Sequence, residues 1–242
     1  VTNSNKSEMG FEMMGQKQQM KNDLQQTMLI TIDGVTDTGY VITATVTRII
    51  FHMSAMGNEV RFDSDSAGKP GFEADPDGRM MEIGKQKKVV INKTGNIIST
   101  EDTLSPTREM ENMGGSLMSL ANAAKRPGQN FGIVAPLPMK PVKAGDKWID
   151  SVNLEGNSGV VEFSLVSIGK EDAHIAHSGK ASNELHLENN GMTMVFKSET
   201  SLVGAYTLDP RTGLATSLNN LTMGAGTIEV AGQVIPVTLK SE

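Results

Sequence analysis

The sequence predicts a mainly β protein: a large curved antiparallel sheet or half-barrel of meander topology, with one central amphipathic helix. Three observations lead to this fold class. Residues 27–53 contain two β-branched runs around a Gly- and Asp-rich turn. From Lys147 onward, short β-like runs alternate with turn residues at regular spacing, which is typical of an antiparallel meander. Residues 105–126 carry the signals of a helix.

The hairpin at residues 27–53 is the strongest β signal in the chain. Thr, Val and Ile dominate both arms, and neither arm contains Pro or Gly. β-branched side chains are restricted at χ1 and fit a pleated surface better than a helix. The second arm, residues 40–53, is much longer than an ordinary strand of about five or six residues. An arm of that length indicates a large curved sheet or barrel.

The N-terminal part of the chain predicts a tether followed by more strands. Residues 1–8 are polar and are expected to form a disordered tether, so that residues 9–242 make up a single β-rich domain. Residues 9–28 contain helix formers, but Gly15 interrupts them, and alternation of Met with polar residues favours a strand over a helix. Residues 59–63 alternate between charged and apolar side chains, which indicates a strand with one wet face.

One helix is expected, at about residues 105–126. It begins with a Ser-Pro pair, which suits the N-cap and the first helical position. Two adjacent glycines in its middle weaken it by roughly 1 kcal/mol each relative to Ala. Apolar side chains recur at helical spacing and predict a face that packs against the sheet. The stripe is Met110, Met113, Leu117 and Leu120, widened by Met118, Ala121 and Ala124.

Loops and shorter strands complete the expected fold. Residues 64–78 are rich in Ser, Gly, Pro and Asp and predict a loop. Residues 131–145 contain three prolines and predict an extended, Pro-rich crossing segment. A further hairpin is expected at 87–99, with its turn at 92–96. The remaining strands are expected at 147–154, 160–168, 174–182, 192–203, 205–208, 215–221, 227–230 and 234–239.

Composition restricts the partners of the chain. Its 22 basic and 28 acidic residues give a net charge of −6 without a basic stripe, so no nucleic acid is expected to bind. No apolar run reaches about eighteen residues, so no segment is expected to span a membrane. The absence of cysteine excludes disulfides, thiolate metal sites and a Cys nucleophile. A polar start at Val1 rather than Met fits a truncated chain or a mature chain that has lost a signal peptide.

No catalytic set can be assembled from the sequence, so the protein is not expected to be an enzyme. His174 and His177 are three residues apart, which places them on opposite faces of a strand and not in a metal-binding pair. No Gly-x-Ser-x-Gly nucleophile motif occurs. The acidic run at residues 73–77 could form a weak calcium site, but a solvated loop is favoured because the spacing differs from the twelve-residue calcium loop. No cofactor and no metal are expected.

Methionine is the unusual residue of this chain, with sixteen Met against seven Phe, two Tyr and one Trp. Met side chains are flexible and suit irregular cores and permissive binding surfaces. Packing in a core or cavity is favoured over Cu(I) binding, because copper sites of that kind combine dense Met and His repeats. The expected lining of a ligand cavity is Met110, Met113, Leu117 and Met118.

Three Asp-Ser/Thr-apolar triplets match the acceptor of a periplasmic O-glycosylation system of some Gram-negative bacteria. Composition alone would yield about one such triplet. The triplet in the loop at residues 64–78 should be the most accessible. The three acceptor side chains would be Ser66, Thr103 and Ser151.

Short motifs at residues 144–151, 204–213 and 234–239 resemble an uncharacterised family (a domain of unknown function) of exported lipoproteins from Gram-negative bacteria. The resemblance implies export and an N-terminal lipid anchor, whose cysteine is absent from this chain. The family has no assigned activity. Physically, Trp148 can anchor the start of a strand, and residues 209–213 can form a tight hairpin. The architecture is also similar to the half-barrel of lipoprotein carriers, in which a curved antiparallel sheet holds an apolar cavity closed by a helix.

The leading hypothesis is a non-enzymatic cell-envelope protein that binds a lipid or another apolar or amphipathic ligand in a Met-lined cavity. The alternative is a structural or protein-interaction module of the outer envelope that has no ligand. We expect the protein to be exported, either to the periplasm or to the outer membrane of a Gram-negative bacterium. It would associate with the membrane only through the lipid anchor. The sequence makes no prediction of the oligomeric state.

Overall fold

The described residues form a single β-sheet of twelve strands. The computed structural model describes residues 1–13, 15–55, 57–66, 83–101, 131–138, 140–154, 157–189 and 192–242. The strands are β1 Thr2–Met13, β2 Gln16–Val35, β3 Gly39–Ala55, β4 Asn58–Asp63, β5 Gln86–Asn92, β6 Ile97–Glu101, β7 Lys147–Leu154, β8 Asn157–Ile168, β9 Ala173–Asn189, β10 Met192–Leu208, β11 Ala215–Val230 and β12 Gln233–Ser241.

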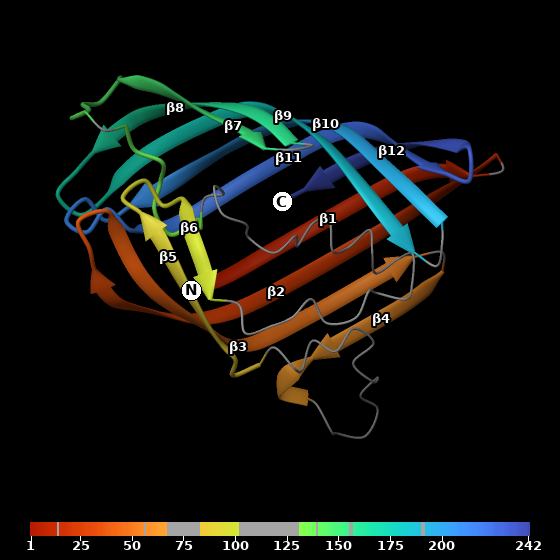
Figure 1. Cartoon of the computed structure of the whole chain (residues 1–242), viewed down its shortest axis with the longest axis horizontal. Helices are drawn as coiled ribbons and strands as arrows, with labels where there is room; N and C mark the ends of the chain where they lie inside the picture. The colour runs from red at the N-terminus through yellow and green to blue at the C-terminus, as the bar shows by residue number, and fades with distance from the viewer. Residues whose placement is uncertain are drawn as a thin grey trace.

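The sheet consists of two antiparallel meanders joined at the two ends of the chain. Its strand order is β6-β5-β3-β2-β1-β12-β11-β10-β9-β8-β7, and β4 pairs with β3 beside this path. The first and last strands pair in the middle, with Ser7 opposite Ser241. Figure 1 shows this arrangement, with the red β1 beside the dark blue β12. The sheet is open, because its end strands β6 and β7 do not pair with each other.

The predicted central helix is wrong. Among the described residues there is no α-helix, and the one helical turn there is the 3-10 turn η1, Ser64–Ser66. Residues 105–126, to which the helix was assigned, lie outside the described residues. The fold class is therefore corrected to one large open antiparallel sheet. No helical layer is needed to form the apolar clusters described below, because the curved sheet and residues 131–138 supply their side chains.

The predicted disordered tether at residues 1–8 is also wrong. Residues 2–8 belong to β1, which pairs with β2 along its whole length and with β12 from Ser7 to Phe11. Their polar composition has a structural explanation, because the outward side chains of β1 face solvent while Ser7 and Met9 lie on the opposite face. Polar strands of this kind resemble linkers in composition alone.

The predicted hairpin at residues 27–53 is confirmed as the pair β2 and β3. The sequence placed its turn at residues 33–39, whereas β2 continues to Val35 and the turn is shorter. A register shift at Thr27/Met28 accommodates one extra residue of β3. The hairpin β5–β6 and the strand β4 also lie where the sequence predicted them.

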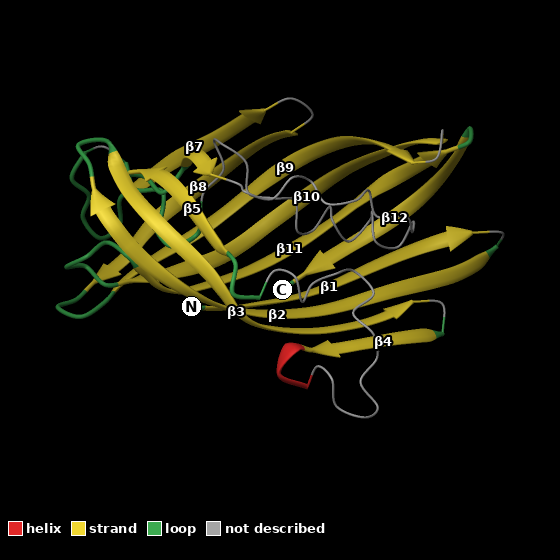
Figure 2. Cartoon of the chain, turned by 60° about the horizontal axis from the view of Figure 1, so that its bottom comes forward, coloured by secondary structure: helices red, strands yellow, loops and turns green. Residues whose placement is uncertain are grey.

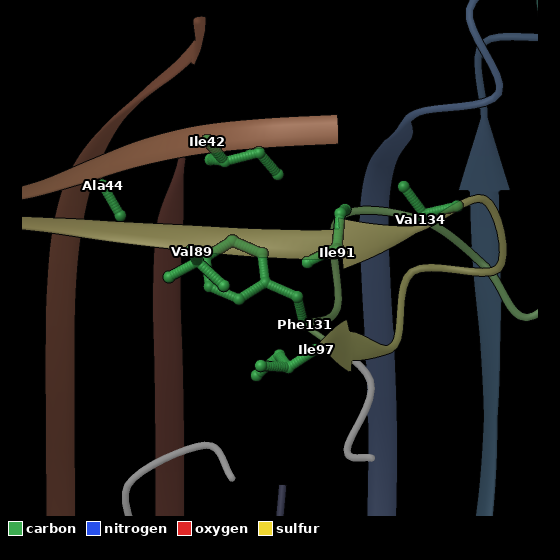
Figure 3. Packing of buried hydrophobic residues seen from close by; sticks show 7 residues of the cluster. All are labelled: Ile42, Ala44, Val89, Ile91, Ile97, Phe131 and Val134. Carbon is green, nitrogen blue, oxygen red and sulfur yellow. The ribbon is translucent and has the colours of Figure 1, made fainter. Parts of the chain in front are cut away.

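One face of the sheet carries nearly all the buried side chains, and we call it the inner face. Figures 1 and 2 show that the sheet is strongly curved, which lets the inner face enclose a core without a second sheet. Four apolar clusters lie on this face. The first is formed mainly by β3 and β5, and the second by β8–β10. The third lies mainly on β2–β4, and the fourth on β1 and β10–β12. Figure 3 shows the first cluster, in which Phe131 and Val134 pack against Ile42, Val89 and Ile91.

The predicted Pro-rich crossing segment connects the two halves of the sheet. Phe131 donates its N–H to Gly95 in the β5–β6 turn, at 2.8 Å. Val134 forms an isolated bridge with Leu214, just before β11. Two residues further on, the carbonyl oxygen of Pro136 accepts a hydrogen bond from the indole N–H of Trp148 on β7 at 2.7 Å. Phe131 and Ala135 belong to different apolar clusters, so this short segment joins the two cores.

Candidate functional site

The inner face is free of charge in nine of the described strands. In strands β1–β4 and β8–β12, every described Lys, Arg, Asp and Glu alternates out of phase with the buried side chains. In β10, for example, Phe196 and Ser198 are buried while Lys197 and Glu199 between them are exposed. Side chains of a strand alternate between the two faces of the sheet. The charged residues of these nine strands therefore lie on the outer face.

The outer face pairs its charges directly across neighbouring strands. Lys6 lies opposite Asp23, and their charged atoms are 3.9 Å apart. Lys197 lies opposite Glu184 at 3.5 Å. Such exposed pairs each contribute little to stability, so their position matters more than their energy. They leave the inner face to neutral side chains.

A band of neutral polar side chains crosses the middle of the inner face, and we call it the polar belt. Asn22, Ser7 and Ser241 are directly opposite one another on β2, β1 and β12. The belt continues onto β11, and it ends at His177 on β9. Apolar clusters lie on both sides of it along the strands. The belt consists of His177, Asn220, Thr222, Ser241, Ser7 and Asn22.

His177 is held by a hydrogen bond that passes over a glycine. Its Nε2 lies 2.8 Å from Oδ1 of Asn220, two strands away, and Gly204 stands between them in the register. A Cβ at Gly204 would lie 2.6 Å from Nε2 of His177 and 2.6 Å from Oδ1 of Asn220. Because the amide oxygen is an acceptor, Nε2 carries the proton and Nδ1 is an acceptor. That Nδ1 atom is buried and has no hydrogen-bond partner.

An aromatic row leads to His177 from the edge of the sheet. Trp148 stacks on Phe163, with ring centroids 5.7 Å apart, and Phe163 lies 5.7 Å from the ring of His177. Tyr206 contacts the other side of the imidazole at 5.2 Å. Burial lowers the pKa of His177 below its usual 6.5, although the bond to Asn220 acts in the opposite direction. The imidazole is therefore neutral at pH 7, and burial also raises the pKa of Tyr206.

Asn22 is the second buried polar side chain of the belt with an unpaired atom. It exposes only 6% of its surface. Its Nδ2 donates to Oγ of Ser7 at 3.5 Å, and its Oδ1 is buried without a hydrogen-bond partner. Ser241 continues this line by donating to Oδ1 of Asn5 at 3.4 Å. Like Nδ1 of His177, the free oxygen of Asn22 can only accept a hydrogen bond.

An apolar row runs alongside the polar belt. Leu239, Met9 and Met20 are directly opposite one another on β12, β1 and β2. Each lies two residues along its strand from a belt residue, a distance of about 7 Å. These side chains link the two clusters at this end of the sheet, because Met9 packs against both. The inner face thus presents a polar line and an apolar line side by side.

The inner face is partly open to solvent along β11. Asn220 is exposed, and Leu218 on the same face exposes 36% of its surface. Both side chains follow the inward phase of β11, which buries Ile228 further along. An exposed stretch of this face can receive a ligand from solvent.

Most of the residues predicted as functional sites are not among the residues that the structure describes. Met110, Met113, Leu117, Met118 and Thr103 lie outside the described residues. Of the other predicted acceptors, Ser66 is half-buried in η1 and Ser151 is exposed on β7. Glycosylation of these residues stays a prediction. The acidic run at residues 73–77 also lies outside the described residues.

The histidine prediction is confirmed in its geometry but missed the burial. His174 and His177 lie on opposite faces of β9, and the side chain of His174 is 45% exposed whereas His177 exposes only 6% of its surface. The sequence carried a signal for this environment, since Gly204 separates the two strands predicted at 192–203 and 205–208. A glycine inside a strand marks a close approach of neighbouring groups. That Gly204 lies between His177 and Asn220 follows only from the register of β9, β10 and β11, and the local sequence pattern does not specify this register.

These features define a class: a single curved antiparallel sheet with a charged outer face and an inner face that carries a polar belt. In its described strands this inner face is neutral apart from Lys87 on β5, opposite Ala44, and Asp150 on β7, opposite Val161. The chain belongs to DUF6263, a family of unknown function, whose model matches residues 37–215. That range runs from the turn before β3 to the first residue of β11. No curated protein and no solved structure matches the chain significantly.

Two kinds of feature are absent from the described residues. None of their helices is long and apolar enough to cross a membrane. The same part of the chain contains no group of three or more His, Asp or Glu side chains that could hold a metal ion.

Proposed function

We propose that this protein is a non-enzymatic binding protein of the bacterial cell envelope, which holds an amphipathic ligand on the inner face of its sheet. One observation carries the proposal. The neutral inner face places a polar belt with two buried, unpaired acceptor atoms beside a row of apolar side chains. A face of this kind suits a ligand with a polar end and an apolar end.

The unpaired atoms favour a ligand over a core that serves stability alone. A buried polar atom without a partner costs about 1–3 kcal/mol relative to a paired one. Most buried polar groups in folded proteins are paired, so the exceptions call for an explanation. A bound polar group that pairs with Asn22 or His177 would offset this cost.

The chemistry of the belt supports binding rather than catalysis. Its groups are amides and hydroxyls around one imidazole, so His177 is the single titratable side chain of the belt and no carboxylate or amine stands beside it there. General acid–base catalysis needs groups that gain and lose a proton near the working pH. Location in the envelope and attachment through an N-terminal lipid anchor are part of the proposal, and the short motifs of the sequence support them.

Titration with an environment-sensitive apolar dye, N-phenyl-1-naphthylamine, tests this proposal. We expect a saturable isotherm with micromolar affinity, because apolar burial contributes roughly 25 cal/mol per Å². Met9→Gln on the inner face should weaken binding at least fivefold. Met223→Gln, at a position 53% exposed on the outer face, is the matched control and should leave the affinity unchanged.

Uptake that does not saturate would overturn the binding proposal. So would an equal effect of the two methionine variants, because the dye would then not be bound at the inner face. Either result would favour the alternative, a structural or interaction module of the envelope without a ligand.

A further inference from the structure

We propose that the ligand carries an uncharged head group that donates hydrogen bonds to the polar belt. The chemical class is a neutral amphiphile with hydroxyl groups and an acyl chain, of which a monoacylglycerol is the simplest example. This inference rests on the proposed function and adds the chemistry of the ligand to it.

The distribution of charge argues for an uncharged head. In strands β1–β4 and β8–β12, the described charged side chains all lie on the outer face. A carboxylate or phosphate placed on the belt would lose its hydration and meet no opposite charge from these strands. Burying an unpaired charge is far more unfavourable than burying a paired polar group. A fatty acid anion or a charged phospholipid head therefore does not fit the belt, because the inward charges Lys87 and Asp150 lie on β5 and β7, outside the strands that form it.

The two unpaired atoms argue for a head that donates hydrogen bonds. Nδ2 of Asn22 is the donor to Ser7, so the free atom Oδ1 is an acceptor. Nε2 of His177 is the donor to Asn220, so the free atom Nδ1 is also an acceptor. Two independent buried sites on one face thus both lack a donor. Hydroxyl groups supply donors without charge, whereas an ester or ether oxygen supplies none.

The position of the apolar row fixes where the chain of the ligand would lie. On β2, β1 and β12, three polar residues of the belt each lie two positions along the strand from an apolar residue. In that strand order, the polar residues are Asn22, Ser7 and Ser241, and the apolar residues are Met20, Met9 and Leu239. A head group bound at the three polar residues would place its acyl chain over the three apolar residues. Methionine adapts to chains of different length, so selectivity should reside in the head group.

Three ligands with the same oleoyl chain separate these arguments. They are 1-monooleoylglycerol, which is neutral and donates hydrogen bonds, methyl oleate, which is neutral without a donor, and oleate at pH 8, which is charged. Each is added to the dye complex of the unaltered protein below the concentration at which the ligand aggregates. We expect 1-monooleoylglycerol to displace the dye at least tenfold more tightly than either of the others.

Asn22→Leu locates the head group, because it removes the free acceptor and keeps the size of the side chain. It should weaken binding of 1-monooleoylglycerol at least fivefold and leave methyl oleate unchanged. Asn219→Leu is the matched control, since Asn219 is exposed on the outer face of β11, and it should change neither affinity. Should Asn22→Leu fail to fold, the comparison of the three ligands on the unaltered protein stands by itself.

The outcomes separate this inference from the proposed function. If oleate or methyl oleate binds as tightly as 1-monooleoylglycerol, the neutral-donor inference is overturned while an amphipathic ligand stands. If Asn22→Leu weakens all three ligands equally, the assignment of the head group to the belt is overturned. If none of the three displaces the dye and the dye itself does not saturate, the proposed function falls as well.

Discussion

At the scale of single residues, His177 links the stability of the fold to pH. Burial lowers the pKa of its imidazole below 6.5, the usual value that the unfolded chain should show. Between these two pKa values the unfolded state binds more protons than the folded state. The stabilising contribution of neutral His177 is therefore complete above pH 6.5 and is lost as the pH falls from 6.5 toward the folded-state pKa.

His177→Phe should reduce this pH dependence. Phe keeps a ring between Phe163 and Tyr206 but cannot take up a proton, and the exposed Asn220 can pair with water instead. The measurement is the free energy of unfolding by urea at pH 7.5 and pH 5.5. We expect the parent to lose more stability than the variant over this range. Equal losses would show that His177 is protonated as easily in the folded protein as in the unfolded chain.

A side chain at Gly204, which lies between His177 and Asn220 in the polar belt, should lower the stability of the fold. Its Cβ would lie 2.2 Å from the backbone oxygen of Asn219 as well as close to the His177–Asn220 bond. Overpacking of this kind costs about 1–3 kcal/mol, and we expect Gly204→Ala to reach the upper end. Gly34→Ala is the control, because no atom lies within 4 Å of a Cβ there. Chemical denaturation that shows equal stability for both variants would contradict the close approach.

Residue-level prediction succeeded where one strand decides the outcome and failed where several strands meet. The period of two in β9 was enough to place His174 and His177 on opposite faces. The same period also separates charged from neutral positions in nine strands, and the sequence contains that pattern in full. The burial of His177 depends on Phe163, Gly204 and Asn220 from three other strands, and no local pattern specifies which strands lie together.

At the scale of elements, the turn between β11 and β12 contains a strained residue. Ala231 has φ 51° and is followed by Gly232 with φ 77°. Both values are positive, as in the two-residue hairpin turns that prefer Asn-Gly. Alanine adopts such a conformation at a cost, because its Cβ approaches the backbone.

Ala231→Asn should therefore stabilise the protein by about 0.5–1 kcal/mol. Thermal unfolding of the variant beside the parent measures the effect. The companion variant Gly232→Ala should destabilise the protein, because it adds a Cβ at a positive φ. A lower melting temperature for Ala231→Asn would indicate that the turn has a different conformation in solution.

Strand existence was predicted well from the sequence, whereas strand ends were not. The sequence divided β10 at Gly204 and β11 at residues 222–226, yet both strands are continuous. Glycine within a strand signals either a break or a close approach of neighbours. A Cβ at Gly226 would lie 2.1 Å from the backbone oxygen of Lys197, so close packing is the reason here. The helix at residues 105–126 rested on apolar spacing and end signals alone, and the described fold contains no helical layer.

At the scale of the whole molecule, the pairing of β1 with β12 joins the two meanders. The N-terminal residues that composition assigned to a tether thus lie in the middle of the sheet. Sequence patterns give the period of each strand but not its partner. The meander order from β7 to β12 followed from the short turns, whereas the pairing of β3 with β5 and that of the first strand with the last could not be predicted in this way.

Deletion of residues 1–8 tests this topology. The deletion removes most of the β1–β2 ladder and leaves β2 and β12 with open edges in the middle of the sheet. We expect the melting temperature to fall by about 10 °C or more, or the chain to fail to fold. A disordered tether could be removed without effect, so an unchanged melting temperature would contradict the pairing of β1 with β12.

The measurement that tests the neutral inner face as a binding site most directly is methyl NMR of the protein labelled with ¹³C at its methionine methyl groups. Met9, Met20 and Met194 lie on the inner face, and Met223 lies on the outer face. On saturation with 1-monooleoylglycerol, we expect the signals of Met9 and Met20 to shift most, Met194 less, and Met223 not at all. Binding that shifts Met223 as strongly as Met9, or that leaves Met9 and Met20 unmoved, would contradict ligand binding at the inner face.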